Sequence, residues 1–250
     1  MADELDHVMM RVEDLEQSLE WYQTHLGYEE TGRWEADTFT NVFLAPPDRT
    51  DEEAQLELTY NHDGRSYEFG DAWGHIAVRV DDVYDAYEKL LNGGVEDYRD
   101  PDSCGGQYAF VKDPDGHEIE LVEREKGARW GLDHTMIRVA DGDAAIGWFA
   151  RKLDYELVRR SELDTFALYF MRPTDSPTAM SVELTVNYDD RSYSIGDAWG
   201  HLAVKTDDLD DEWERLLERD ALDYRDPESC DNRYAFTKTN EGHEIEVVTP

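Results

Sequence analysis

Residues 61–78 read NHDGRSYEFGDAWGHIAV, and residues 187–204 read NYDDRSYSIGDAWGHLAV. The second stretch begins 126 positions after the first, which is about half the length of the 250-residue chain. A repeat of this length must be recognised before any local assignment, because it defines the unit of the fold. Each half is also long enough to bury a hydrophobic core of its own. The chain is therefore predicted to be duplicated.

A smaller repeat lies inside each half. The 17 residues from Asp6 read DHVMMRVEDLEQSLEWY, and those from Gly74, 68 positions later, read GHIAVRVDDVYDAYEKL. The chain thus contains four related units, and each has a His near its start and a Glu near its end. The four pairs are His7 with Glu57, His75 with Glu120, His134 with Glu183, and His201 with Glu246. Four such units can form two sites of four ligands each.

Hydropathy and capping residues predict the same order of elements in every unit. Alternation in LDHVMMRV predicts a strand over 5–12, and Asp14 is a good N-cap for a helix that ends at Gly27. The further strands and helix expected in the first half are strands at 28–34, 38–44, 55–60 and 75–80, a helix at 82–92, and strands at 97–98, 108–112 and 118–122. The predicted class is α+β with four βαβββ units. The domains are expected at 1–124 and 132–250, with residues 125–131 as a linker.

Acidic residues dominate the charge, with 60 Asp and Glu against 24 Lys and Arg and a net charge of −36. Such an excess disfavours nucleic acid and anionic membranes as partners. Disorder is excluded because 40% of residues are hydrophobic, 12% are aromatic, and the apolar positions are periodic. We interpret the surface as an adaptation to high salt, which screens self-repulsion. The chain is predicted to come from a halophile.

The cysteines and the N-terminus indicate a cytoplasmic protein. Cys104 and Cys230 occupy equivalent positions in the two halves. A bridge across a pseudo-twofold axis is one possibility, but free thiols in a cytoplasmic enzyme are favoured. The sequence MADELDHVMM has no signal-peptide pattern, and no apolar run approaches ~18 residues.

Strand parity places the repeated glutamates among buried neighbours. Glu57 shares a face with Thr59 and Asn61, whereas Glu120 points opposite to its apolar neighbours in the strand. A buried ionised carboxylate is costly unless it is paired or binds a metal. Any single His or Glu is readily explained as a satisfied polar residue, but eight matched positions are not. Two His and two carboxylates suit a divalent metal with open coordination positions.

The remaining four histidines are not expected to bind metal. His117 and His243 recur in GHEIE, but parity turns them away from the face of the following glutamate, so they are predicted to be structural. His25 and His62 have no counterpart in the other half and are predicted to lie on the surface or in loops.

The sequence resembles the vicinal oxygen chelate superfamily, and within it the glyoxalase I family. The stretches that carry this resemblance are LDHVMMRVEDLEQSLEWYQTHLGY at 5–28, LELTYN at 56–61, YEFGDAWGHIAV at 67–78 and FVKDPDGHEIELVE at 110–123, with their copies in the second half. The resemblance covers nearly the whole chain. It implies two tandem vicinal oxygen chelate domains, which resemble bleomycin-resistance proteins in fold.

The resemblance implies a reaction. Its substrate is the hemithioacetal of methylglyoxal with a low-molecular-weight thiol, either glutathione or γ-glutamylcysteine, and its product is the 2-hydroxyacyl thioester. A divalent metal polarises the two vicinal oxygens, and a glutamate moves the proton between neighbouring carbons. Glu120 and Glu246 are implied as the bases, with Glu57 and Glu183 as candidates on the opposite face of the substrate.

The resemblance also implies how the site residues group. Each site joins units from different domains, so the two expected metal sites are His7, Glu57, His201 and Glu246, and His134, Glu183, His75 and Glu120. The thiol cosubstrate is expected at Arg11 and Asn61 in the first site and at Arg138 and Asn187 in the second. The metal is expected to be Ni²⁺ or Co²⁺ rather than Zn²⁺, and the chain a monomer that forms a pseudo-dimer.

Two departures and three alternatives qualify the resemblance. TNEG at 239–242 stands where the first half has DPDG, and Val186 stands in place of Tyr60, which predicts two sites of different turnover. An acyl-CoA epimerase would need a basic patch for the CoA phosphates, and only six lysines are present. A ring-cleaving dioxygenase would need only two His and one carboxylate. A non-enzymatic binding module would need no metal.

Overall fold

The computed structural model describes residues 4–51, 53–124 and 130–249, and within these ranges fourteen strands form two seven-stranded sheets. The strands are β1 (Leu5–Val12), β2 (Glu29–Glu35), β3 (Phe39–Ala45), β4 (Gln55–Asn61), β5 (Trp73–Val80), β6 (Tyr108–Lys112), β7 (Glu118–Glu123), β8 (Leu132–Arg138), β9 (Tyr155–Glu162), β10 (Phe166–Pro173), β11 (Ser181–Asn187), β12 (Trp199–Lys205), β13 (Tyr234–Lys238) and β14 (Glu244–Val248). The α-helices are α1 (Leu15–Trp21), α2 (Val83–Asn92), α3 (Gly142–Lys152) and α4 (Leu209–Glu218).

Each sheet combines strands from both halves of the sequence. One sheet has the order β13-β14-β12-β1-β4-β3-β2 and joins the fourth unit to the first, and the other has the order β6-β7-β5-β8-β11-β10-β9 and joins the second unit to the third. The joints are the antiparallel pairs of β1 with β12 and of β5 with β8. The predicted α+β class with two tandem domains of this superfamily type is confirmed, but the units are exchanged between the sheets.

Two elements differ from the prediction. The strand expected at 97–98 is absent; instead Arg99 forms an isolated bridge with Phe110, and Arg225 does the same with Phe236. Pro101, which has no N–H to donate, prevents the pairing from continuing after Arg99. The first helix does not remain α-helical to its end, because Tyr22–Leu26 adopt a π-helix that buries both terminal residues of that segment. Residues 125–129 of the expected linker lie outside the described residues.

Aspartates cap the first two helices, and the prediction for Asp14 is confirmed. Asp14 accepts a hydrogen bond from the backbone N–H of Gln17, and Asp82 accepts hydrogen bonds from the N–H groups of Tyr84 and Asp85. Gly27 ends the first helical segment with φ of +72°, a conformation that favours glycine.

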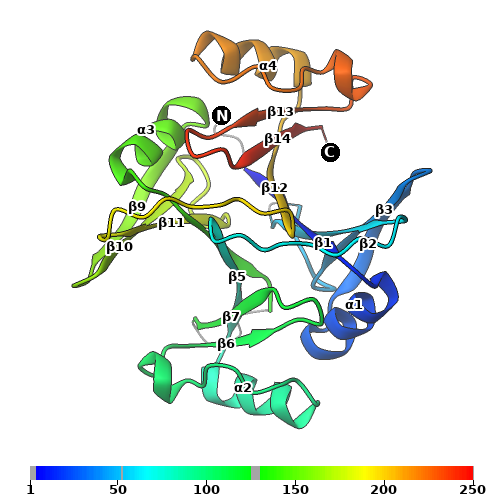
Figure 1. Ribbon diagram of the computed structural model, residues 1–250, viewed down its shortest axis with the longest axis vertical. Coiled ribbons are helices and arrows are strands. Elements are labelled where there is room, and N and C mark those ends of the chain that lie inside the picture. The colour runs from blue at the N-terminus through cyan, green and yellow to red at the C-terminus, as the bar shows by residue number, and fades with distance from the viewer. Residues whose placement is uncertain (1–3, 52, 125–129, 250) are drawn as a thin grey trace.

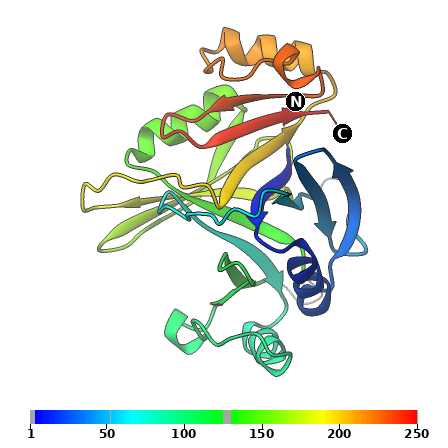
Figure 2. The ribbon, with the colours of Figure 1, turned by 45° about the vertical axis from the view of Figure 1, so that its right-hand side comes forward.

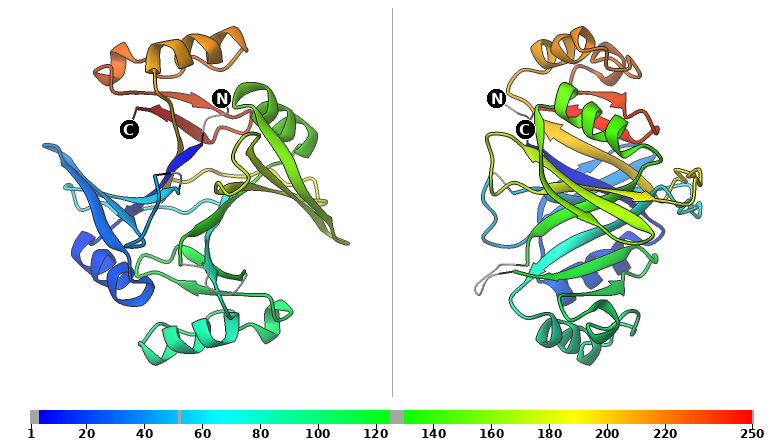
Figure 3. Two further views of the ribbon diagram at one scale, coloured as in Figure 1. Left: turned by 180° about the vertical axis from the view of Figure 1, so that it is seen from behind. Right: turned by 90° about the vertical axis from the view of Figure 1, so that its left-hand side faces the viewer.

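The helices lie on the outside of the strands. Figure 1 shows α4 and α2 at opposite ends of the molecule and α3 and α1 on its two sides, and the views from behind and from the side in Figure 3 keep α4 and α2 at the two ends. None of the helices within the described ranges combines the length and the apolar character needed to span a bilayer. Cys104 and Cys230 are free thiols, as predicted.

The repeated stretch that defines the duplication pairs with its own copy. The backbone N–H groups of Asp71 and Ala72 donate to the carbonyl of Ser194 at 2.8 and 2.9 Å, and those of Asp197 and Ala198 donate to the carbonyl of Glu68 at 2.7 and 3.0 Å. The two segments run side by side across the middle of the molecule in Figures 1 and 2. They join the two sheets near a local pseudo-twofold axis.

Glycine and tryptophan residues of this stretch make the close approach possible. Gly70 and Gly196 have φ of +63° and +69°, and a Cβ at either position would lie 2.2 or 2.3 Å from a carbonyl oxygen of the opposite segment. Trp73 stacks on Trp199 with ring centroids 5.5 Å apart and an interplanar angle of 6°. The two copies of the repeated stretch therefore pack against each other.

Candidate metal and substrate sites

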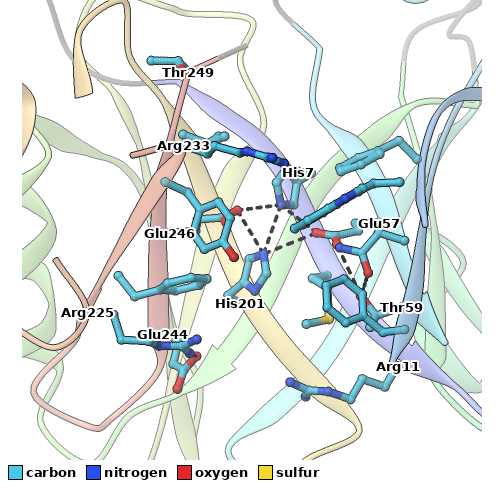
Figure 4. A pocket seen from close by; sticks show the side chains of 18 of the residues that line it. His7, Arg11, Glu57, Thr59, His201, Arg225, Arg233, Glu244, Glu246 and Thr249 are labelled. Carbon is cyan, nitrogen blue, oxygen red and sulfur yellow. Dashed lines mark hydrogen bonds and ion pairs between the residues drawn. The ribbon is translucent and has the colours of Figure 1, made fainter. Parts of the chain in front are cut away.

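The first candidate site is a buried cluster that joins the first and fourth units. Nε2 of His7 lies 2.9 Å from Glu57, 3.1 Å from Glu246 and 3.0 Å from Nε2 of His201. Nε2 of His201 lies 3.4 Å from Glu57 and 3.2 Å from Glu246. Figure 4 shows these four side chains converging from both sides of the cavity. All four are buried, and a ligand atom from each lies within 4.8 Å of the others.

The second candidate site joins the second and third units with the same geometry, apart from one residue. Nε2 of His134 lies 2.9 Å from Glu120 and 3.2 Å from Glu183, and Nε2 of His75 lies 3.2 Å from Glu120 and 3.3 Å from Nε2 of His134. His75, Glu120 and His134 form a tight group, and Glu183 lies outside it because it contacts only one of the two imidazoles. The two sites therefore differ at the glutamate of the third unit.

Parity along the strands explains why these side chains meet. In β1, His7, Met9 and Arg11 line the cavity, while Val8 and Met10 are fully buried in the core. β4 runs parallel to β1 and places Glu57 opposite Met9, so its carboxylate lies beside the imidazole of His7. The antiparallel joint with β12 brings in His201 from the far half of the chain.

A carboxylate from the preceding residue fixes the orientation of one imidazole in each cluster. Asp6 lies 2.8 Å from Nδ1 of His7, and Asp133 lies 2.8 Å from Nδ1 of His134. Such a contact holds the proton on Nδ1 and turns the lone pair of Nε2 toward the cluster. The His of the second and fourth units follows a glycine, because a Cβ on Gly74 or Gly200 would lie 2.2 Å from a methionine of the neighbouring strand.

The electrostatics of both clusters favour ionised carboxylates. Burial alone would raise the pKa values of Glu57, Glu120 and Glu246, but the neighbouring imidazoles hold all three below the usual range. Burial would likewise lower the pKa of His7, but Glu57 and the contacts with Asp6 and Glu246 raise it. The carboxylate charges therefore persist inside a buried site, where a cation compensates them well.

The donor atoms fit a divalent metal ion. In each cluster two imidazole nitrogens face one another at hydrogen-bond distance, and carboxylate oxygens lie against them. Two Nε2 atoms that both lack a proton cannot hydrogen-bond to each other, whereas the lone pairs of both can point at one cation. Two His and two carboxylates are a common ligand set for zinc, nickel and other first-row metals.

Each cluster lies in a cavity that is large enough for a small peptide-like ligand. The cavity over His7 and His201 has a volume of about 540 Å³, and the cavity over His75 and His134 has a volume of about 880 Å³. Ligand pockets generally enclose ~300–1,000 Å³. Both volumes lie in that range.

The residues expected to hold the thiol line the same cavities. Arg11 donates to the carbonyls of Asp197 and Trp199 at 2.9 Å each, and the amide of Asn61 donates to the hydroxyl of Tyr67 at 2.7 Å. Their counterparts Arg138 and Asn187 line the second cavity and make the equivalent contacts, with the carbonyls of Asp71 and Trp73 and with the hydroxyl of Tyr193. These contacts fix the side chains at the cavity walls.

The other four histidines lie outside both clusters. His117 and His243 are fully buried and lie 3.4 Å from backbone carbonyls of Ala198 and Ala72, on the opposite repeated segments. Their structural role stays a prediction, and His117 also lies with Asp113 and Asp115 in a group of side chains that could hold a metal ion. His62 is exposed in a turn after β4, and His25 is half-buried in the π-helix.

Two groups of site residues were missed by the sequence reasoning. The first group is Asp6 and Asp133, although the repeated Asp-His dipeptide at 6–7 and 133–134 was a usable signal. The second is the phenylalanines that pack edge-on against the four imidazoles with ring centroids 5.2–5.3 Å apart, namely Phe43, Phe110, Phe170 and Phe236. They repeat at matched positions, but their apolar character makes them look like ordinary core residues.

Comparisons with known proteins give matches in both halves of the chain. Residues 4–121 and 131–247 match the Glyoxalase/Bleomycin resistance protein/Dioxygenase superfamily. A lactoylglutathione lyase of Arabidopsis thaliana is 32% identical over 210 residues, covering 81% of this chain and 74% of the relative. The lactoylglutathione lyase of Neisseria meningitidis serogroup A is 42% identical over 126 residues, covering 48% of this chain and 91% of the relative.

Solved structures extend the similarity to the whole chain. Glyoxalase I from Zea mays superposes with a TM-score of 0.88 and 26% identity, covering 99% of this chain and 92% of the maize chain. The duplicated sequence, the exchanged sheets and the two His/Glu clusters therefore occur in a chain that belongs to the glyoxalase/bleomycin resistance protein/dioxygenase superfamily and, within it, to the lactoylglutathione lyases.

Proposed function

We propose that the protein is a glyoxalase I that converts the hemithioacetal of methylglyoxal and a small thiol into the 2-hydroxyacyl thioester and so detoxifies methylglyoxal. The observation that carries this proposal is the pair of buried His/Glu clusters, each at the wall of a cavity that also holds an Arg and an Asn at matched positions. The similarity to lactoylglutathione lyases and the superposition with the maize enzyme support it.

Two metal sites are part of the proposal. One would be held by His7, Glu57, His201 and Glu246, and the other by His75, Glu120, His134 and Glu183. When bound, the divalent metal would act as a Lewis acid toward the two vicinal oxygens of the substrate. We propose Ni²⁺ or Co²⁺ because two His, two Glu and two open positions suit octahedral coordination, whereas zinc sites are more often four-coordinate.

The chain's own carboxylates move the proton. Glu246 in the first site and Glu120 in the second are the proposed bases, and each lies against both imidazoles of its cluster. The base takes the proton from the carbon that bears the hydroxyl and the sulfur, and the proton returns to the neighbouring carbonyl carbon. Glu57 and Glu183 face the substrate from the other side. The reaction is an isomerisation and needs no oxidant or reductant.

The thiol part of the substrate is assigned to the opposite end of each cavity. Arg11 and Asn61 in the first site, and Arg138 and Asn187 in the second, would bind the charged γ-glutamyl end. Guanidinium groups form strong charge-assisted hydrogen bonds with carboxylates. Both glutathione and γ-glutamylcysteine present this end, and both are proposed as cosubstrates.

The organisation of the chain leads to a proposal about its assembly. Both clusters are completed by residues of one chain, so a monomer that mimics a dimer suffices for activity. We assign domains to residues 1–124 and 132–250 as the units of the sequence duplication, with 125–131 joining them. The cytoplasm is the proposed location, because Cys104 and Cys230 are free thiols.

The excess of acidic residues supports a halophilic origin. The net charge of −36 makes repulsion between surface carboxylates the main electrostatic cost at low salt. The midpoint of urea unfolding should rise steeply between about 0.1 and 2 M KCl as the Debye length falls. A midpoint that does not depend on salt would contradict this origin.

A direct assay tests the proposed function. Apo-protein reconstituted with Ni²⁺ should form the thioester from methylglyoxal and glutathione or γ-glutamylcysteine, followed by its ultraviolet absorbance. Chelation of the metal should abolish the reaction. Lack of turnover with both thiols, in a protein shown to contain metal, would refute the assignment.

A further inference from the structure

The linings of the two cavities differ at several matched positions, and one of these differences lies beside the metal clusters. Gly32 in β2 lies opposite Phe43, which in turn lies opposite Glu57. In the other sheet Arg159 in β9 lies opposite Phe170, which lies opposite Glu183. Both β2 and β9 carry a bulge next to this position, so the two rows are structurally equivalent. One row thus has a glycine where the other has an arginine that lines its cavity.

In one row Arg159 covers the ring of Phe170, whereas in the other row Gly32 has no side chain to cover the ring of Phe43. The guanidinium of Arg159 stacks over Phe170 at 3.6 Å from the ring centroid, and Phe170 packs edge-on against the metal-site residue His134. Arg159 lines the cavity of this site, whereas in the other site Phe43 itself is part of the cavity wall.

The guanidinium of Arg159 is available to bind an anion. Within the described part of the chain it has no carboxylate at ion-pair distance, and its side chain is exposed. Its neighbour Arg160 is different, because it forms an ion pair with Glu162 and does not line the cavity. Arg99 also stacks over a phenylalanine of this cavity, but it is paired with Glu118, and its counterpart Arg225 is paired in the same way in the other site. Within these two rows, Arg159 therefore adds a charge that Gly32 lacks. The other cavity has an arginine elsewhere, because Arg233 stacks over Trp34 where this cavity has Gln107.

We propose that Arg159 determines substrate specificity and gives the site of His75 and His134 a preference for ligands with a carboxylate near the metal cluster. Gly32 gives the site of His7 and His201 an apolar surface at the same place, formed by Phe43. This inference rests on the proposed function, which places the γ-glutamyl end of the ligand at the Arg and Asn and the group attached to sulfur at the cluster. The two sites of one chain thus select different 2-oxoaldehyde substituents.

The chemistry of the guanidinium supports a carboxylate ligand. Its planar fork binds a carboxylate through two parallel hydrogen bonds, and its stacking on Phe170 leaves the edges of the fork free. Arg159 is level with Glu183 across the sheet, whereas Asn187 lies four residues farther along β11 at the end assigned to the thiol. The carboxylate that Arg159 would bind is therefore a second one, separate from the γ-glutamyl group.

Binding of two inert thioethers tests the proposal without turnover. The probes are S-benzylglutathione and S-(4-carboxybenzyl)glutathione, which differ by one carboxylate, titrated calorimetrically into the Ni²⁺-loaded full chain. The wild-type protein should bind the carboxylated probe tightly at one site per chain. Arg159→Gly should lose this tight site, with affinity reduced about tenfold or more. Gly32→Arg should create a second tight site, since a Cβ at Gly32 would lie 3.5 Å from Phe43, an ordinary contact.

Matched variants separate charge from shape. Arg160→Gly should retain one tight site, and Arg159→Lys should bind the carboxylated probe with intermediate affinity. Equal affinity for the two probes at both sites, failure to bind the carboxylated probe, or an unchanged number of tight sites in both Arg159→Gly and Gly32→Arg would overturn the proposal. Conversion of the methylglyoxal hemithioacetal is measured on the same samples, so a failure of the proposed function is seen separately.

Discussion

The carboxylate of Asp6 lies 2.8 Å from Nδ1 of His7, and this contact directs Nε2 of the imidazole into the cluster of His201, Glu57 and Glu246. Asp133 makes the same contact with His134 but is also held by Arg124 at 2.6 Å. A carboxylate thus positions the imidazole in both sites, and the carboxylate of Asp133 is in addition ion-paired with Arg124.

Asp6→Ala should weaken metal binding at the first site. Loss of the carboxylate frees the imidazole of His7 to rotate and to change tautomer, and outer partners of this kind are typically worth about 10–100-fold in metal affinity. Competition with a chelator, with Ni²⁺ as the metal, should show one weakened and one normal site per chain. Asp14→Ala, which removes a helix cap away from the cluster, is the control; equal weakening in that variant would argue against a specific role of Asp6.

Glu120→Gln and Glu246→Gln should each inactivate one site. Removal of a general base typically costs about 10²–10⁴-fold, so each single variant should retain only the turnover of its intact site, and the double variant should be nearly inactive. The comparison is made with kcat per chain at saturating substrate. If Glu120→Gln alone abolished all activity, the site with Glu246 would be inactive and the two-site assignment would be wrong.

The apo-protein should regain most of its activity with Ni²⁺ or Co²⁺ and little with Zn²⁺. The reason is that the cluster offers four protein ligands and leaves room for two substrate oxygens, which makes six. Metal content should be measured on the same samples, so that failure to bind is distinguished from failure to act. Full activity with Zn²⁺ alone would refute this preference.

The buried histidines His117 and His243 should affect stability at acidic pH in opposite ways, because their pKa values are shifted in opposite directions. Burial lowers the pKa of His243 to about 4. Below the ordinary histidine pKa the unfolded chain therefore binds a proton that the folded chain does not, and stability falls as pH drops from about 6.5 to 4 by at most about 3 kcal/mol. The pKa of His117 is raised, because the charge and hydrogen bond of Asp113 outweigh its burial. Its contribution is present at low pH and is lost as pH rises through the raised value.

Thr239→Asp should give His243 the partner that His117 has, since Thr239 occupies the position of Asp113. We expect the pKa of His243 to rise and the acid sensitivity of unfolding to decrease. Ring-proton NMR titration reports the pKa, and urea unfolding at pH 5 and 7 reports the stability. A pKa for His243 that stays near 4 in this variant would show that burial alone controls it.

Gly70→Ala should destabilise the protein more than Gly64→Ala. Both glycines have positive φ, +63° and +67°, but a Cβ at Gly70 would meet the carbonyl of Ser194 at 2.2 Å, while nothing lies within 4 Å of one at Gly64. The control should lose about 1 kcal/mol from backbone strain, and Gly70→Ala should lose more because the paired segments must separate. Equal losses in urea unfolding would contradict the close approach of the repeated segments.

Much of the fold and the site could be predicted from the sequence, for an identifiable physical reason. Side-chain direction in a strand follows parity, so His7 and Arg11, or Glu57 and Asn61, share a face before any tertiary contact is known. Capping by Asp14 is equally local. The strand expected at 97–98 was wrong, because Arg99 alone pairs with Phe110 and the two residues before it form no ladder.

The sequence by itself determined which residues carry the chemistry, because the four-fold recurrence of His and Glu is a property of the chain. The tertiary structure decided how the units group, since hydrogen bonding between β1 and β12 and between β5 and β8 selects the partners. It also decided that the two sites are not equal. The roles proposed for Arg159 and Gly32 depend on tertiary structure, because strand pairing places each of them beside a phenylalanine that packs against a cluster.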